Sequence, residues 1–327
     1  MKKILILLLL LFACGSQNDT FDVGVIVPLT GPASYYSQNY VKGMELALEE
    51  TPGIQIHVQD GKLDSTESIK VANSLEHLVD PEAYLVVFGV PTHAVAPLLQ
   101  ETGKPLLYEA YTRDIAELYP NAYKSNFDAQ SSCKELTKRI AHEKIGVLFA
   151  NIMYTDECLK GIRQVTDVTE YRYPYGNLDF RTLLLKAEKD GIERLFIMGL
   201  SHEILNMFKQ LTEMGSDMRV ACAASSECII PLVEKSIPQD RLKGTLSVDY
   251  IPETIVGSEF GKKYLQKYPE AEKTEIMNAA AGFEAIKVLA SRFGDYTSII
   301  GTKGFQNRIM QTEHYVYEYD GGWKVVG

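Results

Sequence analysis

The chain has 327 residues, enough for about two domains of ordinary size. Its residues are 46% hydrophobic and 23% charged, a globular composition that excludes fibrous, collagen-like and wholly disordered chains. With 33 basic and 43 acidic residues the net charge is −10, so nucleic acid is not expected as a partner.

The first 20 residues have the pattern of an export signal. Lys2 and Lys3 precede an apolar run over residues 4–12, which is too short to cross a bilayer because a spanning helix needs about 20 apolar residues. The run ends in Leu11-Phe12-Ala13-Cys14, which resembles a bacterial lipobox. That resemblance implies a signal peptide over residues 1–13, a lipidated Cys14 that begins a tether over residues 14–20, and an extracytoplasmic, lipid-anchored location. The alternative is an ordinary signal peptide with an incidental cysteine.

Strand-like and helix-like patterns alternate in the first half of the chain after the tether. Apolar or alternating runs predict strands at residues 21–27, 54–58, 84–88 and 105–108. Apolar positions at helical spacing predict helices at residues 40–48, 64–79 and 94–102. Asp64 and Glu67 have the spacing of an N-cap and its capping glutamate, which marks the start of the second of these helices.

The second half repeats the same order. Strands are predicted at residues 144–150, 169–173, 194–198 and 219–223, and helices around residues 159–165, 181–190 and 203–214. Strand and helix alternating through both halves predicts an α/β protein of two Rossmann-like lobes, each with a parallel sheet.

Ligands of open α/β sheets bind beyond the carboxyl ends of the strands, so the loops there are candidate binding segments. These loops are residues 29–36, 90–93, 108–112, 151–154, 200–202 and 224–227, and they converge on one cleft if the lobes face each other. Hydroxyls at helix starts suit a carboxylate, which makes Thr92 and Thr112 candidates. Tyr36, Tyr111 and Tyr154 would supply aromatic walls. Taken singly, each of these residues is ordinarily a packing or capping residue, and His93 is expected at the cleft edge rather than on a metal.

Apart from Cys14, the chain has four cysteines, an even number that permits two disulfides in an exported protein. Cys133 and Cys158 begin helical patterns on either side of one strand, and Cys222 and Cys228 are close in sequence. The three possible pairings stay open. The spacings match no zinc motif, and no metal or cofactor is expected.

Several segments together resemble the type I periplasmic binding proteins, most of all their branched-chain amino-acid branch, which serves ABC importers. They are VIVPLTGPASYY at residues 25–36, GMELAL at 43–48, NAAAGF at 278–283, HYVYEY at 314–319 and GWKVV at 322–326. The resemblance implies two discontinuous lobes that close on a solute by a hinge, with crossings near Asn126, near residues 250–252 and near Gly301. Lobe 1 would hold residues 21–125 and 252–300, and lobe 2 residues 126–251 and 301–327.

The resemblance also assigns roles to individual residues. Tyr36 falls on an aromatic wall, Thr92 and Thr112 on hydroxyls that hold a ligand carboxylate, and Tyr154 on a tyrosine of the second lobe. Ser201 and Ser225 stand where relatives often have a tyrosine and the acid that pairs with a ligand ammonium. A buried ammonium needs a counter-charge, so either Glu227 or Glu109 reaches the ligand, or the ligand is not an α-amino acid.

The expected function is therefore capture of an amino acid or related small solute for the permease of an ABC importer, by a monomer without enzymatic activity. Gly199-Leu200-Ser201-His202-Glu203 only partly matches the nucleophile elbow of hydrolases, since the second glycine is missing. The rival function is that of a lipoprotein sensor, or of an activator that contacts a cell-wall enzyme through the same fold. A polar cleft with convergent hydroxyls favours the solute.

Overall fold

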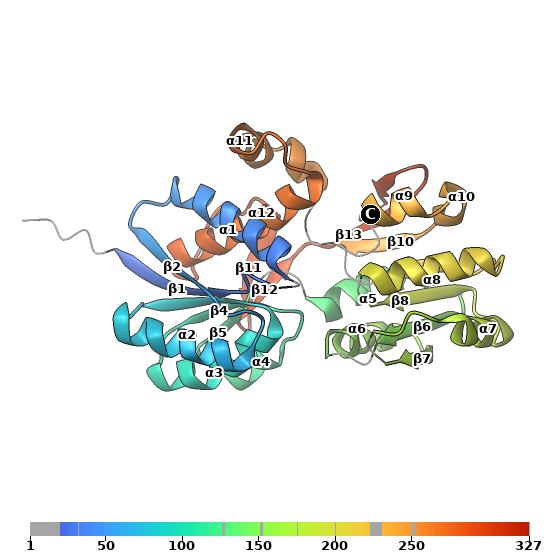
Figure 1. Cartoon of the computed structure of the whole chain (residues 1–327), viewed down its shortest axis with the longest axis horizontal. Helices are drawn as coiled ribbons and strands as arrows, with labels where there is room; N and C mark the ends of the chain where they lie inside the picture. The colour runs from blue at the N-terminus through green and yellow to red at the C-terminus, as the bar shows by residue number, and fades with distance from the viewer. Residues whose placement is uncertain are drawn as a thin grey trace, which may run out of the picture.

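The computed structural model describes residues 20–326, except for residues 32, 126–127, 151–152, 175, 200, 223–230, 250 and 252. The expected signal peptide, Cys14 and nearly all of the tether lie outside this range. The described chain forms two lobes side by side, each built on a mostly parallel sheet of seven strands (Figure 1).

The sheet of lobe 1 has the strand order β11-β12-β5-β4-β3-β1-β2. Its strands are β1 (Phe21–Val27), β2 (Ile54–Asp60), β3 (Ala83–Val87), β4 (Leu106–Glu109), β5 (Ala122–Lys124), β11 (Thr302–Gln306) and β12 (Ile309–Thr312). Its helices are α1 (Ser34–Leu48), α2 (Ser65–Leu78), α3 (Gly89–Thr102), α4 (Asp114–Leu118), α11 (Glu259–Lys267) and α12 (Lys273–Ala290), with a 3₁₀ turn at Glu253–Gly257.

The sheet of lobe 2 has the order β14-β13-β10-β9-β8-β6-β7. Its strands are β6 (Ile145–Ala150), β7 (Thr169–Tyr173), β8 (Arg194–Met198), β9 (Arg219–Cys222), β10 (Leu246–Asp249), β13 (Tyr315–Tyr319) and β14 (Trp323–Val325). Its helices are α5 (Ala129–Ile140), α6 (Met153–Arg163), α7 (Arg181–Lys189), α8 (Ser201–Glu213), α9 (Pro231–Ser236) and α10 (Gln239–Leu242). The alternating α/β order predicted from the sequence is confirmed.

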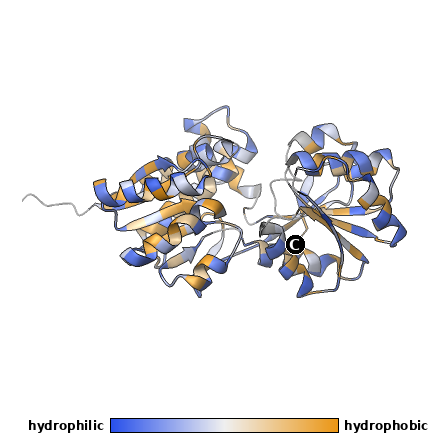
Figure 2. Ribbon diagram, turned by 60° about the horizontal axis from the view of Figure 1, so that its bottom comes forward, coloured by the Kyte–Doolittle hydropathy of each residue, from blue (hydrophilic) through white to orange (hydrophobic). Residues whose placement is uncertain are grey.

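Helices cover both faces of each sheet, which explains why the strands read as continuous apolar runs. In β1, Val23 and Val25 pack with α1 and α12 on one face, and Ile26 packs with α2 and α3 on the other. Figure 2 shows the apolar residues gathered on the strands and on the inner sides of the helices. One cluster of buried apolar side chains includes residues of lobe 1, Ile251, and residues of α5 and β6, so the lobes share part of their core.

The chain passes between the lobes three times. The first passage lies between β5 and α5 and the second around Ile251. The expectation of a third crossing near Gly301 is wrong. Residues 302–312 form the hairpin of β11 and β12 in lobe 1, and the chain crosses at residues 313–314. Asn307 and Arg308 adopt φ of 51° and 62°, which allows the tight turn, and β12 then pairs with β5.

Buried charges surround the first crossing. Arg113 of lobe 1 donates from Nε to Asp128 Oδ1 at 2.9 Å, with a second contact between Nη2 and Oδ2. Asp128 is also the N-cap of α5 and accepts from Ser131 N. Burial acts to raise the pKa of Asp128, but Arg113 and the nearby Lys124 outweigh it and lower that pKa to about 2. Arg113 and Asp128 therefore tie the end of lobe 1 to the first helix of lobe 2.

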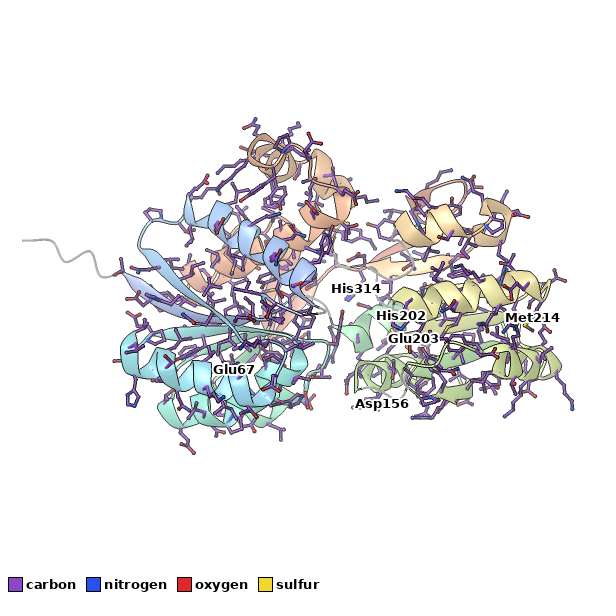
Figure 3. All side chains as sticks on the ribbon, in the orientation of Figure 1. Glu67, Asp156, His202, Glu203, Met214 and His314 are labelled. Atoms are coloured by element: carbon purple, nitrogen blue, oxygen red, sulfur yellow. A yellow bond between two sulfur atoms is a disulfide. The ribbon has the colours of Figure 1, made fainter. Side chains whose placement is uncertain are left out.

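Lys124, the last residue of β5, is fully buried beside this pair. Its Nζ donates to Ser125 O at 3.3 Å. Burial lowers the pKa of Lys124 to about 8, although the charges of Asp128 and Glu109 act to raise it. His314 lies in the third crossing, between the lobes (Figure 3), and burial lowers its pKa against the opposing charge of Asp128. The crossings are thus neighbours in space as well as in topology.

Glycines set the close approach of α1 and α12. A Cβ on Gly282 would meet the carbonyl oxygen of Tyr40, and one on Gly43 would meet that of Ala279, both well inside van der Waals contact.

We expect Gly282→Ala to lower the free energy of unfolding by about 2 kcal/mol, since the helices must separate although alanine favours helix. Urea unfolding followed by circular dichroism measures the change. Gly257→Ala is the control, because a Cβ there meets nothing within 4 Å. A Gly282→Ala variant as stable as the wild type would contradict this packing.

The lowered pKa of Asp128 makes its contribution to stability pH-dependent. A carboxyl whose pKa is lower in the folded state stabilises the fold above its unfolded pKa and loses that effect as the pH falls toward its folded pKa. Since the pKa falls from 3.8 to about 2, Asp128→Asn should cost roughly 2 kcal/mol at pH 7 and about half of that at pH 3. Asparagine keeps the N-cap, so the change isolates the charge. Asp64→Asn, at the exposed N-cap of α2, is the matched control. An equal cost at both pH values would refute the assignment.

Candidate functional site

The topology brings the carboxyl ends of the parallel strands of both sheets to the region between the lobes. β5 and β12 both run toward a crossing, so the carboxyl ends of all the parallel strands of lobe 1 adjoin lobe 2. The carboxyl end of β10 leads into the second crossing, so the parallel strands of lobe 2 likewise end toward lobe 1. Figure 3 shows His202 and Glu203 at the end of α8 nearest lobe 1, and Met214 at the far end. The segments that follow these strands are the candidate site.

Several expected loop residues lie instead in the first turns of helices. Tyr36 is in α1, Thr92 and His93 are in α3, and Tyr154 and Ser201 are in α6 and α8. The connections after the strands are shorter than the sequence indicates because the helices begin before their apolar pattern does. Short connections place these residues close to the strand ends.

In lobe 1, Asp60 holds the segment between β1 and α1. Its carboxylate accepts from Leu29 N at 2.9 Å, from Thr30 Oγ1 at 2.6 Å and from Lys62 N at 2.9 Å. Burial acts to raise the pKa of Asp60, but these hydrogen bonds outweigh it and the pKa is lowered. The first segment of the site is therefore fixed within lobe 1.

Tyr36, Phe88 and Glu109 form a second group, at the carboxyl ends of β3 and β4. Tyr36 Oη donates a hydrogen bond to Glu109 Oε1, and the rings of Tyr36 and Phe88 pack edge to face, with centroids 5.4 Å apart. Phe88 has a φ of 75°, a strained conformation for a bulky residue, and its N–H donates to Glu109 O. Strain of this kind concentrates at binding sites.

The two threonines of lobe 1 differ in what their hydroxyls do. Thr92 is fully buried and donates from Oγ1 to Phe88 O at 2.7 Å. Its hydroxyl proton is therefore directed to the backbone, whereas the sequence predicted that it would bind a ligand carboxylate. Thr112 is 4% exposed, and its buried Oγ1 has no hydrogen-bond partner among the described residues. A buried hydroxyl without a hydrogen-bond partner destabilises the fold unless a ligand supplies that partner.

The other expected residues of lobe 1 lie beside these two. Tyr111 is half-buried against the core. His93 Nε2 lies 3.4 Å from Asp114 Oδ2, at the start of α3. Tyr108 Oη donates to Thr112 O at 3.2 Å and accepts from Ala116 N at 3.1 Å, which fixes the backbone that carries Thr112.

One described acid at the facing edge of lobe 2 is Glu203, in the first turn of α8. Glu203 has no exposed surface; it accepts from Gly176 N at 2.9 Å, and its Oε2 lies 3.3 Å from Tyr173 Oη. These contacts tie the segment after β7 to α8. The side chains of Tyr154 and Ser201, and the whole of Ser225 and Glu227, lie outside what the structure describes.

The described cysteines of lobe 2 form disulfides. A disulfide joins Cys133 of α5 to Cys158 of α6 with a Cα–Cα distance of 5.3 Å, which confirms one of the pairs suggested by the sequence. Cys222, at the end of β9, is disulfide-bonded as well, and Cys228 lies outside the described residues.

Other features of the described residues do not add to this site. Two depressions of about 420 and 480 Å³ open at the opposite end of lobe 2, around Lys243 and Asp320 and around Glu193 and Ser216. No cluster of three or more His, Cys, Asp or Glu residues suited to a metal ion occurs within the described ranges. In those same ranges no helix combines the length and the apolar character that crossing a membrane requires.

The sequence did not reveal three residues that shape the candidate site or the adjoining crossing. Phe88 follows an apolar strand, and nothing in its neighbourhood signals a positive φ. Arg113 and Asp128 are 15 residues apart, and their pairing depends on the geometry of the crossing. The position of Arg113 directly after the candidate residue Thr112 was the one signal that could have drawn attention to it.

Comparisons with known proteins agree with this architecture. The family model described as periplasmic binding protein matches residues 20–294. No curated protein matches the chain by sequence. A leucine-binding protein from Thermotoga maritima is 16% identical with a TM-score of 0.76, covering 94% of this chain and 98% of its own.

Two further solved structures are similar over nearly their whole length. A branched-chain amino-acid transporter substrate-binding protein from Streptococcus pneumoniae, in complex with isoleucine, is 17% identical with a TM-score of 0.76, covering 94% of this chain and 98% of its own. A solute-binding protein of an ABC transporter from R. palustris, in complex with 4-hydroxybenzoate, is 18% identical with a TM-score of 0.74, covering 94% and 95%. At these identities the structures establish the fold, and the family model spans most of the sequence. The chain belongs to the periplasmic binding protein family.

Proposed function

We propose that this chain is the solute-binding lipoprotein of an ABC importer, and that it holds an amino acid or a related small carboxylate between its lobes. The observation that carries the proposal is the buried Thr112 hydroxyl, which has no partner among the described residues at the edge of lobe 1 facing lobe 2. A carboxylate oxygen accepts such a hydrogen bond, and a charged acceptor strengthens it.

The solutes named for the similar structures are consistent with this chemistry. Isoleucine and 4-hydroxybenzoate differ in size and in charge, but both carry a carboxylate. Tyr36, Tyr111 and His93 of lobe 1 would line the solute, and Tyr154, Ser201, Ser225 and Glu227 would reach it from lobe 2 on closure. The role of the protein is capture rather than catalysis.

The remaining parts of the proposal concern where the protein acts. A signal peptide over residues 1–13 and a lipid on Cys14 would keep a monomer outside the cytoplasm and near the permease that receives the solute. The three crossings provide the hinge about which the lobes close.

A thermal-shift screen tests the proposal on the chain from Gly15 onward, which contains every residue that the structure describes. A solute at about 100 times its Kd stabilises the folded state by about 2.7 kcal/mol, which for a chain of this size raises Tm by about 5 °C. We expect such a shift with an amino acid or a small organic acid. No shift with any amino acid, short amide or small organic acid would count against the proposal.

Thr112→Val tests where the solute binds. Valine has nearly the same shape but no hydroxyl, so the affinity for a carboxylate solute should fall roughly tenfold to hundredfold. The melting temperature without solute should stay within about 1 °C, because the hydroxyl has no described partner to lose. Isothermal titration calorimetry measures the affinity.

Thr212→Val is the matched control, because that hydroxyl bonds to Phe208 O near the other end of α8. The Thr212→Val variant should bind the solute with the affinity of the wild type. An unchanged affinity of the Thr112→Val variant would place the carboxylate elsewhere.

A further inference from the structure

His314 lies in the third crossing, in the short segment that joins β12 of lobe 1 to β13 of lobe 2. Figure 3 shows this histidine between the lobes. Its side chain is half-buried, and its Nε2 is buried with no hydrogen-bond partner among the described residues. A titratable ring therefore occupies a place where the chain must bend when the lobes move.

The protonation state of His314 decides whether this place suits it. A neutral imidazole keeps one nitrogen without a proton, whereas an imidazolium carries an N–H on both nitrogens. Protonation therefore puts an N–H on Nε2, where the described residues offer no acceptor. A buried N–H without an acceptor and a buried charge both destabilise the arrangement that encloses them.

The charged groups that face His314 are divided between the lobes. Arg113 and Lys124 belong to lobe 1, and Asp128 and Glu135 belong to α5 of lobe 2. Burial is the main cause that lowers the pKa of His314. The two cations of lobe 1 act in the same direction, and the two acids of lobe 2 act against them.

The remaining acids around this ring are paired with lysines. Glu135 Oε1 accepts from Lys138 Nζ at 2.6 Å, and Glu313 Oε1, on the segment of His314 itself, lies 2.9 Å from Lys303 Nζ. A proton on His314 would therefore enter a region whose charges are already paired in this arrangement.

An acceptor for the new N–H lies on α5. Ser132 is four residues after Asp128 and three before Glu135, so the three share one face of the helix, the face whose acids act on His314. Ser132 is fully buried, and its Oγ has no hydrogen-bond partner among the described residues. A shift of the third crossing toward α5 would give Nε2 both an acceptor and a favourable charge.

We propose that His314 makes the hinge pH-sensitive: when it gains a proton, the third crossing moves away from the cations of lobe 1 and toward α5, and the lobes leave the arrangement described here. A histidine with a lowered pKa stabilises its arrangement above the ordinary value of 6.5 and loses that effect as the pH falls below it. Each pH unit below that value changes the ratio of the two arrangements by up to about tenfold, until the lowered pKa is reached.

Distances between the lobes test the inference on the chain from Gly15 onward, without solute. Spin labels are placed by Lys70→Cys in α2 and Lys209→Cys in α8, both exposed and on different lobes. Double electron–electron resonance gives the distance distribution at pH 8 and at pH 5. The same chain without the two introduced cysteines reports any label on native cysteines.

We expect the ratio of the two distance populations to change about tenfold between these pH values when His314 is present. With His314→Gln the ratio should change less than twofold, because glutamine is polar but gains no proton. His142→Gln makes the same exchange at a histidine whose side chain is 75% exposed and should keep the full response.

Glu135→Gln provides a second test, which also serves if His314→Gln does not fold. It removes an acid that favours the protonated ring, so the midpoint of the response should move to lower pH. An unchanged midpoint contradicts the inference.

The other outcomes are equally decisive. A distance distribution that is the same at both pH values overturns the inference, as does a response that survives in His314→Gln or disappears in His142→Gln. Because no solute is present, these outcomes do not bear on the proposed function, and a failure to bind any solute would not bear on the hinge.

Discussion

Every part of the candidate site depends on one topological constraint: the parallel strands of both sheets end where the chain crosses between the lobes. Because a right-handed crossover returns each strand to the same direction, all the segments that follow those strands meet at the facing edges. Helix N-termini, with their N–H groups, therefore point to the same region. The hinge passes through that region too, so a rotation at the crossings changes the distance between the two halves of the site.

The two lobes differ in how they hold the segments of the proposed site. In lobe 1, Asp60 fixes the segment after β1, and Tyr108 fixes the backbone around Thr112. Recognition groups held this rigidly lose little conformational entropy on binding. Lobe 2 is joined to this arrangement through Arg113, which is bonded to Asp128 at the start of α5. The residue next to Thr112 is thus part of the connection that must adjust when the lobes move.

Local signals in the sequence were sufficient for most of the fold. Strands buried on both faces read as apolar runs, and Asp64 caps α2 through Glu67 N as its spacing predicts. Strand β5 escaped prediction because its three residues are too few to show a periodic pattern. The hairpin at residues 302–312 joins lobe 1 through the pairing of Ile309 with Lys124, which are far apart in sequence, and the third crossing was misplaced with it. The site was harder to predict. The bond between Tyr36 and Glu109 spans 73 residues, and the direction of the Thr92 hydroxyl depends on the backbone of Phe88.

The disulfide between Cys133 and Cys158 has a mechanical consequence. It fastens α5, which begins at the first crossing, to α6, which begins at the edge of lobe 2 facing lobe 1. Gly161 brings the two helices so close that a Cβ there would collide with the backbone of Gln130. The two helices are therefore joined covalently and by close packing. Any change in the direction of α5 at Asp128 would carry the start of α6 with it, and reduction of the disulfide would weaken that connection.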